Sequence, residues 1–301
     1  MILKPSKEGF FYVIRMIAKR FISKVINHIV FLIRKRHYVF TPVFIIGCGR
    51  SGTTVLGQTL AQHTNICYLN ERRDLWHNAY PEFNIWSSSK KGAILEATAE
   101  HHQTKKSRQL RQLFFKEQVL HKSTILLEKL PINSFRIEFL RACFPEARFI
   151  YLHRNGMEVS HSIEKAIALG NWYGQNNQKQ LLLNELAQKN GMDTDNIILQ
   201  PLHQALMEWR LSIEYSHQAF KAMDKALFIN LSYQDLTSDS PKWLKNIFQF
   251  LSLDCEDTLI QKYSSTIRKS KPQKIVVDED HKTIGGHFLT QSMTNTYLKY
   301  V

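Results

Sequence analysis

Glycine, proline and cysteine are all scarce in this 301-residue chain, which has 12 Gly, 8 Pro and 4 Cys. So few turn-forming residues, together with 11% aromatic residues, exclude a disordered or low-complexity chain. The cysteines are Cys48, Cys67, Cys143 and Cys255. They are widely scattered with no Cys-x-x-Cys pair, so they indicate neither a zinc site nor a disulfide framework. This usage favours a reducing compartment, and we expect a cytoplasmic protein.

Acidic residues are also fewer than basic ones: the chain has 26 Asp and Glu and 40 Lys and Arg, which gives a net charge of +14. Such a charge favours anionic partners: nucleic acids, acidic lipid surfaces, acidic peptides or multiply charged nucleotides. The chain has no zinc-finger spacing and no RNA-binding aromatic motif, so nucleic acid is not expected. A hydrophobic content of 44% suffices for one large α/β domain or two small ones.

Residues 10–33 lack the uninterrupted apolar run of a transmembrane helix or a signal peptide. The run is broken by Arg15, Lys19, Arg20 and Lys24. At 3.6 residues per turn, one side collects Phe10, Ile14, Ile17, Phe21, Val25, Ile29 and Leu32, and the other collects Arg15, Lys19, Ser23, Lys24 and Asn27. We therefore predict that 1–40 forms a basic amphipathic segment before a domain at 41–301. The segment either binds an anionic membrane surface, making the protein peripheral on the membrane, or packs on its own domain.

Short apolar runs alternate with helical segments from residue 41 onward. The expected strands are 43–46, 66–69, 124–127, 148–152 and 226–231. The expected helices are 53–62, 134–144 with Asn133 or Ser134 as its cap, 157–169, 199–223 and 240–251. The polar stretch 170–196 is expected to form a lid or insertion. The repeated strand-then-helix order predicts a three-layer α/β/α fold, similar to P-loop NTPases, with a mostly parallel sheet of about five strands.

The loop after the first expected strand lacks the lysine of a Walker A motif. It reads Gly47-Cys48-Gly49-Arg50-Ser51-Gly52-Thr53-Thr54, with Thr53 at the lysine position of GxxxxGK[ST]. Its glycines permit close backbone approach, and the following helix offers free N–H groups to an anion. Without the lysine, the loop lacks the side chain that binds the γ-phosphate of ATP with Mg²⁺, which disfavours an ATP kinase. A P-loop kinase of a small molecule or nucleotide stays the alternative, as does an ordinary strand–turn–helix connection.

A second motif, Arg154-Asn155-Gly156, follows the fourth expected strand, with Ser160, His161 and Ser162 on the next helix. Ligands of open α/β sheets bind at the carboxyl ends of the strands, so both loops can serve one nucleotide. Arg154 and Ser162 would supply hydrogen-bond donors to a phosphate.

Taken in order, these motifs resemble the sulfotransferase family that uses 3′-phosphoadenylyl sulfate (PAPS). Gly-x-x-Arg-Ser-Gly-Thr-Thr is followed by Arg-Asn-Gly and by Ser162 eight residues after Arg154. Further matching pieces are Glu128-Lys129-Leu130-Pro131-Ile132-Asn133, Phe144-Pro145-Glu146-Ala147-Arg148-Phe149-Ile150, Trp209-Arg210 and Tyr233-Gln234-Asp235-Leu236. Gln234 departs from the family, which usually has Glu there. The resemblance spans about 41–253.

The resemblance implies that the loop at 47–54 holds the 5′-phosphosulfate and that Arg154 and Ser162 hold the 3′-phosphate. The donor-binding residues that it implies are Arg50, Ser51, Gly52, Thr53, Thr54, Arg154, Ser162 and Tyr233, the last against adenine. It also implies that Lys129 and Arg50 stabilise charge on the leaving phosphate.

The pattern is nearest to the branch that contains tyrosylprotein sulfotransferases, running from Arg50 through His63-Thr64-Asn65 to Asn70-Glu71-Arg72. This likeness implies that Glu71 is the general base. The plain alternative for Glu71 is a solvated carboxylate paired with Arg72 or Arg73. Cytosolic sulfotransferases use a histidine base, for which His121 and His153 are the nearest candidates.

The resemblance thus implies in-line transfer of the sulfuryl group from PAPS to a hydroxyl or amine, giving adenosine 3′,5′-bisphosphate and needing no metal. The acceptor is left open among a glycan, a protein tyrosine and a lipid, because 72–120 and 170–198 carry no readable signature. Trp76, Trp86 and Trp172 could stack on a sugar or aromatic acceptor, or belong to the core. A basic adaptor acting through 1–40 is the non-enzymatic alternative.

Overall fold

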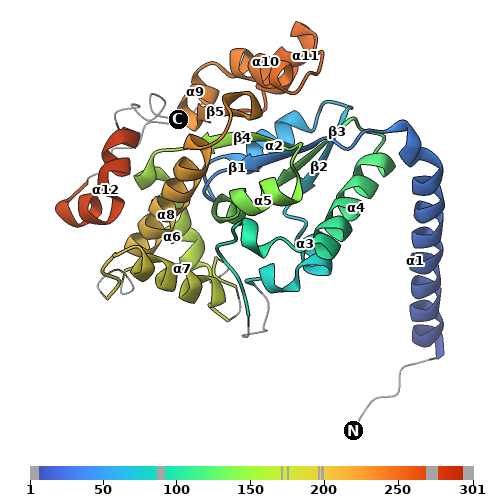
Figure 1. Cartoon of the computed structure of the whole chain (residues 1–301), viewed down its shortest axis with the longest axis horizontal. Coiled ribbons are helices and arrows are strands. Elements are labelled where there is room, and N and C mark those ends of the chain that lie inside the picture. Colours follow the sequence, from blue (N-terminus) through green and yellow to red (C-terminus); the bar gives the residue numbers. More distant parts are fainter. Residues whose placement is uncertain are drawn as a thin grey trace.

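Five parallel strands form one sheet in the order β2-β3-β1-β4-β5, as the computed structural model shows (Figure 1). The strands are β1 (Pro42–Ile46), β2 (Ile66–Asn70), β3 (Ile125–Lys129), β4 (Arg148–His153) and β5 (Phe228–Ser232). The structure describes residues 7–86, 92–170, 172–174, 176–195, 197, 200–268 and 277–293. The expected strands therefore lie within one or two residues of the observed ones.

Helices cover both faces of the sheet. The helices of the described residues, including α1, which lies outside these layers, are α1 (Lys7–Arg34), α2 (Thr53–Leu60), α3 (Arg73–Ala79), α4 (Thr104–Leu120), α5 (Ile137–Cys143), α6 (Gly156–Ala168), α7 (Gln178–Lys189), α8 (Pro201–Lys221), α9 (Tyr233–Ser238), α10 (Ser240–Phe250), α11 (Asp257–Ser264) and α12 (Glu279–Met293). Short 3-10 turns lie at Lys35–His37, Pro81–Phe83, Ala99–His101, Pro131–Phe135 and Lys225–Leu227.

The central strand β1 explains why its sequence is apolar throughout. Successive side chains of a strand point to opposite faces of the sheet. Phe44 and Ile46 pack in a core with α4, α5, α6 and α8, whereas Val43 and Ile45 pack in a second core with α2, α10 and α11. Both faces are thus buried, and the predicted three-layer α/β/α fold is confirmed.

The order of the strands places the two predicted motifs side by side. From β1 the chain runs to β2 and β3 on one side of the sheet, and only then to β4 and β5 on the other. Neighbouring strands whose connections leave in opposite directions open a crevice at their carboxyl ends. Since β1 pairs with β4 up to Ile46 and Tyr151, the loops after both strands border this crevice.

Local starts of helices were less well predicted than strands. Asn133 and Ser134 do not cap a helix but lie in the Pro131–Phe135 turn, where Asn133 is buried and donates to Glu128 Oε2 over 3.0 Å. The helix α5 instead begins after the buried Arg136, whose guanidinium donates to the carbonyl oxygens of Leu95 and Ile94 over 3.0 and 2.6 Å. The buried hydrogen bonds outweigh the local capping preference.

Two other expected segments contain helices. The stretch 170–196, expected as a polar lid or insertion, contains the regular helix α7. Residue 199, where a long helix was expected to begin, lies outside the described residues, and α8 begins at Pro201.

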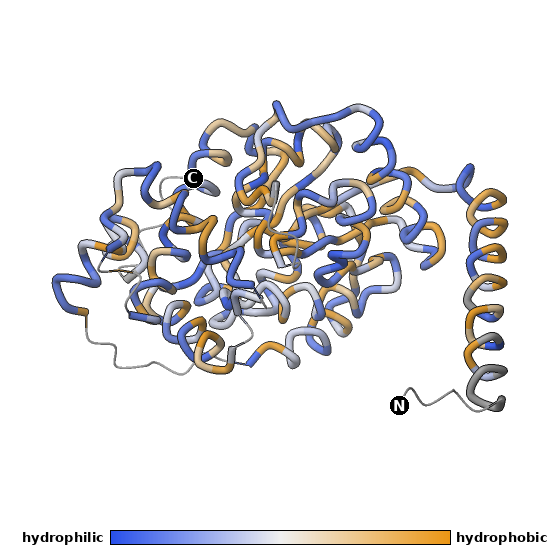
Figure 2. Tube along the Cα trace, turned by 90° about the horizontal axis from the view of Figure 1, so that it is seen from below, coloured by the Kyte–Doolittle hydropathy of each residue, from blue (hydrophilic) through white to orange (hydrophobic). Residues whose placement is uncertain are grey.

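The helix α1 stands apart from the body of the protein (Figures 1 and 2). Near the end of α1, the ring of Phe31 packs edge to face against Phe115 of α4, with ring centroids 5.9 Å apart. No helix among the described residues combines the length and apolarity needed to cross a bilayer. The boundary near residue 40 stays a prediction.

Candidate functional site

The loop at 47–54, between β1 and α2, has the close packing expected of an anion-binding loop, and we call it the anion cradle. A Cβ on Gly47 would lie 2.2 Å from the carbonyl oxygen of Leu152, so only glycine allows β4 this close. Gly52 has a φ of +96°, and a Cβ there would meet the ring of Tyr233 at 2.4 Å. Thr53 and Thr54 open α2, where backbone N–H groups lack intrahelical partners. The Ser51 hydroxyl is buried and has no hydrogen-bond partner within the described residues.

The crevice brings together Arg50 from the first loop, Arg154 from the loop after β4 and Ser162 from α6. Arg50 Nε donates to Ser162 Oγ over 2.9 Å, across the gap between the first loop and α6. Arg154 donates to the carbonyl oxygen of Arg50 over 3.4 Å and to Glu158 over 2.7 Å. Its guanidinium also lies 4.4 Å from the centre of the Tyr233 ring. The polar groups predicted to hold the two ends of the donor therefore lie side by side.

Glu71 lies at the same edge of the sheet, directly after β2. Lys129 Nζ donates to Glu71 Oε1 over 2.7 Å, and Arg73 donates to Glu71 Oε2 over 2.9 Å. The Lys129 side chain is only 1% exposed. The sequence predicted both residues at this edge but not their contact, which follows from the parallel register that pairs Asn70 with Lys129. Arg73, not Arg72, is the arginine on Glu71, since Arg72 pairs with Asp74 and Glu117.

The two cations keep Glu71 ionised. Burial by itself would raise the pKa of Glu71, but the hydrogen bonds and positive charges of Lys129 and Arg73 outweigh it and hold the pKa below its ordinary value. Glu71 is thus deprotonated at neutral pH, the form that a general base requires, while the same two cations lower its affinity for a proton.

The two histidines considered as alternative bases lie elsewhere. His121 is exposed at the end of α4, with Nδ1 2.9 Å from the carbonyl oxygen of Glu117. His153 is buried at the end of β4, and this burial lowers its pKa to about 4. Neither residue lines the cavity beside Glu71.

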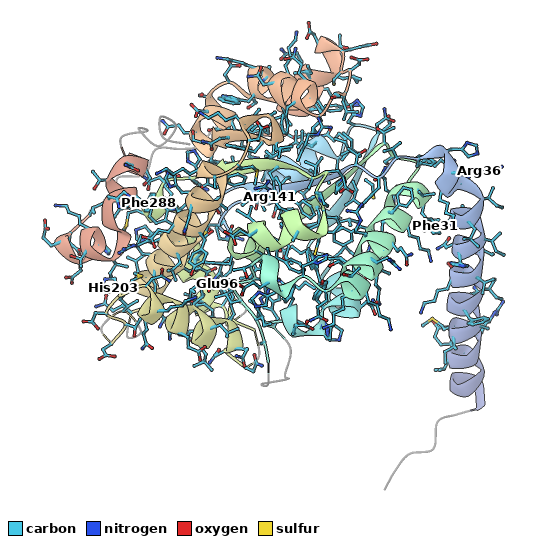
Figure 3. All side chains as sticks on the ribbon, viewed as in Figure 1. Phe31, Arg36, Glu96, Arg141, His203 and Phe288 are labelled. Carbon is cyan, nitrogen blue, oxygen red and sulfur yellow. The ribbon has the colours of Figure 1, made fainter. Side chains whose placement is uncertain are left out.

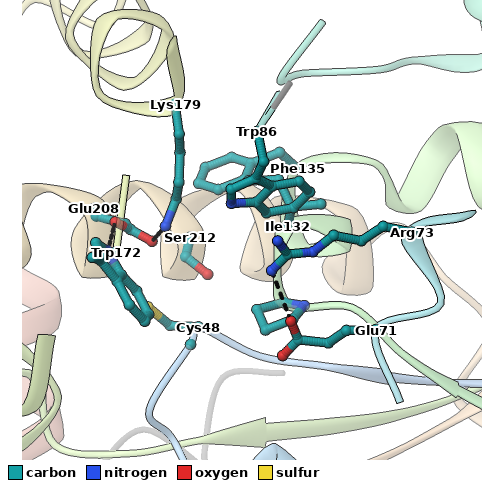
Figure 4. Close-up of a pocket in the computed structure, with 12 residues that line it drawn as sticks. Cys48, Glu71, Arg73, Trp86, Ile132, Phe135, Trp172, Lys179, Glu208 and Ser212 are labelled. Carbon is teal, nitrogen blue, oxygen red and sulfur yellow. Dashed lines mark hydrogen bonds and ion pairs between the residues drawn. The ribbon is translucent and has the colours of Figure 1, made fainter. Parts of the chain in front are cut away.

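A cavity of about 130 Å³ opens between Glu71 and the loop at 47–54 (Figure 4). Its lining residues come from the loop at 47–54, from the segments after β2 and β3, from the segment between α6 and α7, and from α7 and α8 themselves. They are Cys48, Gly49, Glu71, Arg73, Trp86, Pro131, Ile132, Phe135, Trp172, Lys179, Glu208 and Ser212. Trp172 packs on the loop itself, because a Cβ on Gly49 would lie 2.6 Å from its ring. The cavity therefore joins Glu71 to the loop at 47–54.

A buried ion pair between Lys179 and Glu208 faces Glu71 across the cavity (Figure 4). Lys179 Nζ donates to Glu208 Oε1 over 2.6 Å, and both side chains are 6% exposed. Trp172 Nε1 donates to the other carboxylate oxygen over 2.7 Å, and Lys179 Nζ lies 4.1 Å from the centre of a Trp172 ring. Sequence reasoning missed this pair, because no spacing links α7 to α8; the only signal was the Trp209-Arg210 motif directly after Glu208.

The three tryptophans considered for acceptor contact separate into two groups. Trp76 is 2% exposed and donates from Nε1 to the buried Glu128, so it belongs to the core. Trp86 and Trp172 line the cavity, and the Arg73 guanidinium stacks on Trp86 at 3.7 Å. Within the described ranges, no cluster of three or more His, Cys, Asp or Glu side chains is placed to hold a metal ion.

The chain is similar to several known proteins. A model described as the sulfotransferase family matches residues 42–257. The solved sulfotransferase domain of the olefin synthase of Synechococcus PCC 7002 is 19% identical, with a TM-score of 0.51, and the match covers 83% of this chain and 95% of that domain. A sulfotransferase from Mycobacterium avium is 14% identical, with a TM-score of 0.48 and coverage of 91% and 81%.

A curated protein without an assigned function, from Aquifex aeolicus strain VF5, is 22% identical over 244 residues. That match takes in 74% of this chain but 27% of the relative, so the chain spans about a quarter of its length. At such identities, the likeness to solved structures concerns the fold.

Proposed function

This chain belongs to the sulfotransferase family, and from that membership we propose that it transfers the sulfuryl group of PAPS to an acceptor hydroxyl. The observation that carries the proposal is the meeting of Arg50, Arg154 and Ser162 at the anion cradle, beside a cavity that Glu71 lines. Adenosine 3′,5′-bisphosphate is the other product.

The residues of the crevice suit this donor. The buried hydroxyl of Ser51 and the N–H groups that open α2 are available to a phosphosulfate. Arg154 and Ser162 offer charge-assisted hydrogen bonds to a second phosphate. A sulfuryl group carries less negative charge than a phosphoryl dianion, and in this site Arg50 and Lys129 supply positive charge in place of the Walker lysine.

The proposed reaction is a single displacement. Glu71 takes the proton of the acceptor hydroxyl while that oxygen forms a bond to sulfur. The bond between sulfur and the bridging oxygen breaks, and its electron pair stays on the departing phosphate. Lys129 and Arg50 stabilise the charge that develops there. Because Lys129 also holds Glu71, the same ammonium orients the base in the resting enzyme.

Donor binding tests the proposal. We expect calorimetry to show binding of adenosine 3′,5′-bisphosphate without added metal, and weak or no binding of ATP with Mg²⁺. Arg154→Ala should weaken binding by about 10- to 100-fold, because charged hydrogen bonds to the phosphate are lost. Arg111→Ala, which removes another arginine paired with a glutamate, is the control and should bind normally. Tight ATP binding with no bisphosphate binding would instead support the kinase alternative.

The lining of the cavity favours one class of acceptor. Trp86 and Trp172 provide aromatic faces, while Lys179, Glu208 and Arg73 provide charged hydrogen-bonding groups. A purely apolar acceptor would displace water from these groups without replacing its hydrogen bonds, which is costly. We therefore propose that the acceptor is polyhydroxylated, as in a sugar residue of a glycan. Peptide tyrosine, suggested by the likeness to tyrosylprotein sulfotransferases, and lipid alcohols are the alternatives.

Radiolabelled PAPS and a panel of acceptors distinguish these classes. We expect alkyl glycosides to be sulfated at least about 100-fold faster than a tyrosine peptide or a fatty alcohol. A site that hydrogen-bonds several hydroxyl groups of a sugar rejects acceptors that carry only the reacting hydroxyl. Trp172→Ala should raise KM for the glycoside, while Trp243→Ala on α10, which does not line the cavity, should not. Preferential sulfation of the peptide would contradict the assignment.

A further inference from the structure

The helix α1 carries an apolar stripe that is open to solvent. Ile17, Phe21, Val25 and Ile29, spaced by four residues and hence on one face, are 61%, 67%, 42% and 51% exposed. We call these four residues the apolar stripe. Figure 2 shows hydrophobic residues along α1, which stands clear of the rest of the chain. An apolar surface of this length on a long exposed helix marks an interaction site.

The domain touches the other side of the helix. Val30, Phe31 and Arg34 are the half-buried residues near the end of α1, and at 3.6 residues per turn they lie opposite the apolar stripe. Figure 3 labels Phe31 on the side toward α4, where it contacts Phe115. Within the described residues, then, the protein does not cover the apolar stripe with its own domain.

The charges around the stripe have one sign. Arg15, Lys19 and Lys24 are exposed, and none of them has an ion-pair partner in the described part of the chain. Exposed Lys35 and Arg36 follow the helix. The sequence has no Asp or Glu from residue 9 to residue 70. A partner for this surface must therefore be apolar at its centre and anionic at its rim.

The geometry points to the surface of an anionic membrane as that partner. We propose that α1 lies in the plane of the interface, with the apolar stripe among the acyl chains and the cations beside anionic headgroups. Its 28 residues give a contact about 42 Å long. A second copy of the chain fits less well, because helices paired through the stripe would bring their cations together without any acidic residue between them. The inference is independent of the sulfotransferase reaction.

Vesicle flotation of the full-length chain tests the proposal. We expect binding to phosphatidylcholine vesicles that contain phosphatidylglycerol, and at least about tenfold weaker binding to phosphatidylcholine alone, since each Lys or Arg near an anionic surface contributes roughly fivefold. The variant Phe21→Glu/Val25→Glu/Ile29→Glu should lose at least about tenfold in binding to the anionic vesicles.

A matched control separates the stripe from net charge. Val39→Glu/Leu169→Glu/Leu259→Glu changes exposed apolar residues outside α1 by the same charge, and should bind the vesicles like the unaltered chain. An unchanged circular dichroism spectrum and an unchanged melting temperature verify that both variants are folded. Equal vesicle binding by the stripe variant and the control would overturn the proposal. The proposal would also be overturned if the unaltered chain were a dimer, the stripe variant were a monomer, and neither of them bound to vesicles.

Discussion

Glu71→Gln is expected to lower kcat by about 1000-fold, since general-base catalysis commonly contributes factors of 10² to 10⁴. Glutamine keeps an oxygen that accepts the Lys129 hydrogen bond, so the fold and the affinity for adenosine 3′,5′-bisphosphate should change little. Steady-state kinetics with labelled PAPS measures the loss, and calorimetry measures the affinity. A variant with near-normal kcat would remove Glu71 from the role of base.

The pH profile carries a second signature of Glu71. A base with a depressed pKa is active above that pKa and loses activity as pH falls through it. Because the pKa of Glu71 is held below its ordinary value, the acidic limb of kcat/KM should lie below the pH at which an ordinary glutamate titrates. Asp74→Asn is the control, since Asp74 lies three residues away and pairs with Arg72 instead. It should leave both kcat and this limb in place.

Lys129→Met is expected to lower kcat by about 100- to 1000-fold, the usual cost of removing one preorganised stabiliser of transition-state charge. Methionine approximately fills the buried space of the lysine stem, so the loss should not come from unfolding. The substitution also removes a hydrogen bond and a charge that depress the pKa of Glu71, whereas burial, which raises it, persists. The acidic limb of kcat/KM should therefore move to higher pH.

Lys106→Met provides the comparison for Lys129. Lys106 is also paired with a glutamate, Glu82, over 2.8 Å, but its side chain is 33% exposed, and Glu82, unlike Glu71, does not line the cavity. Its replacement should leave kcat and the pH profile unchanged. If both lysine variants lost activity equally, or if Lys129→Met kept its acidic limb, a specific role for Lys129 at the reacting centre would be contradicted.

The sheet and the anion cradle could be predicted from the sequence because each depends on local patterns. A short apolar run in the sequence predicts a strand that is buried on both faces, and this pattern predicts the positions of β1 and β4. The loop at 47–54 combines glycines with a helix start, and parallel strands bring their carboxyl ends to one edge. The proximity of Arg50 to Ser162, 112 residues apart, follows from topology alone.

The charged contacts of the cavity could not be predicted in this way. Lys179 and Glu208 come from helices whose relative placement depends on packing, and a lysine in a polar stretch gives no sign of its burial. The same holds for Arg136, whose buried guanidinium replaces the expected helix cap with bonds to distant carbonyl oxygens. Predicting such a contact requires the relative positions of two segments that are distant in the sequence.

The backbone itself limits how this protein could be stabilised by design. Arg50 and Glu71 have left-handed conformations, with φ of 69° and 51°, which non-glycine residues adopt at an energetic cost. A redesign that selected residues for thermal robustness alone would favour glycine or asparagine at both positions. It would thereby delete the two side chains that we propose to border the donor and the acceptor, so heat resistance and the proposed turnover would compete at these two residues.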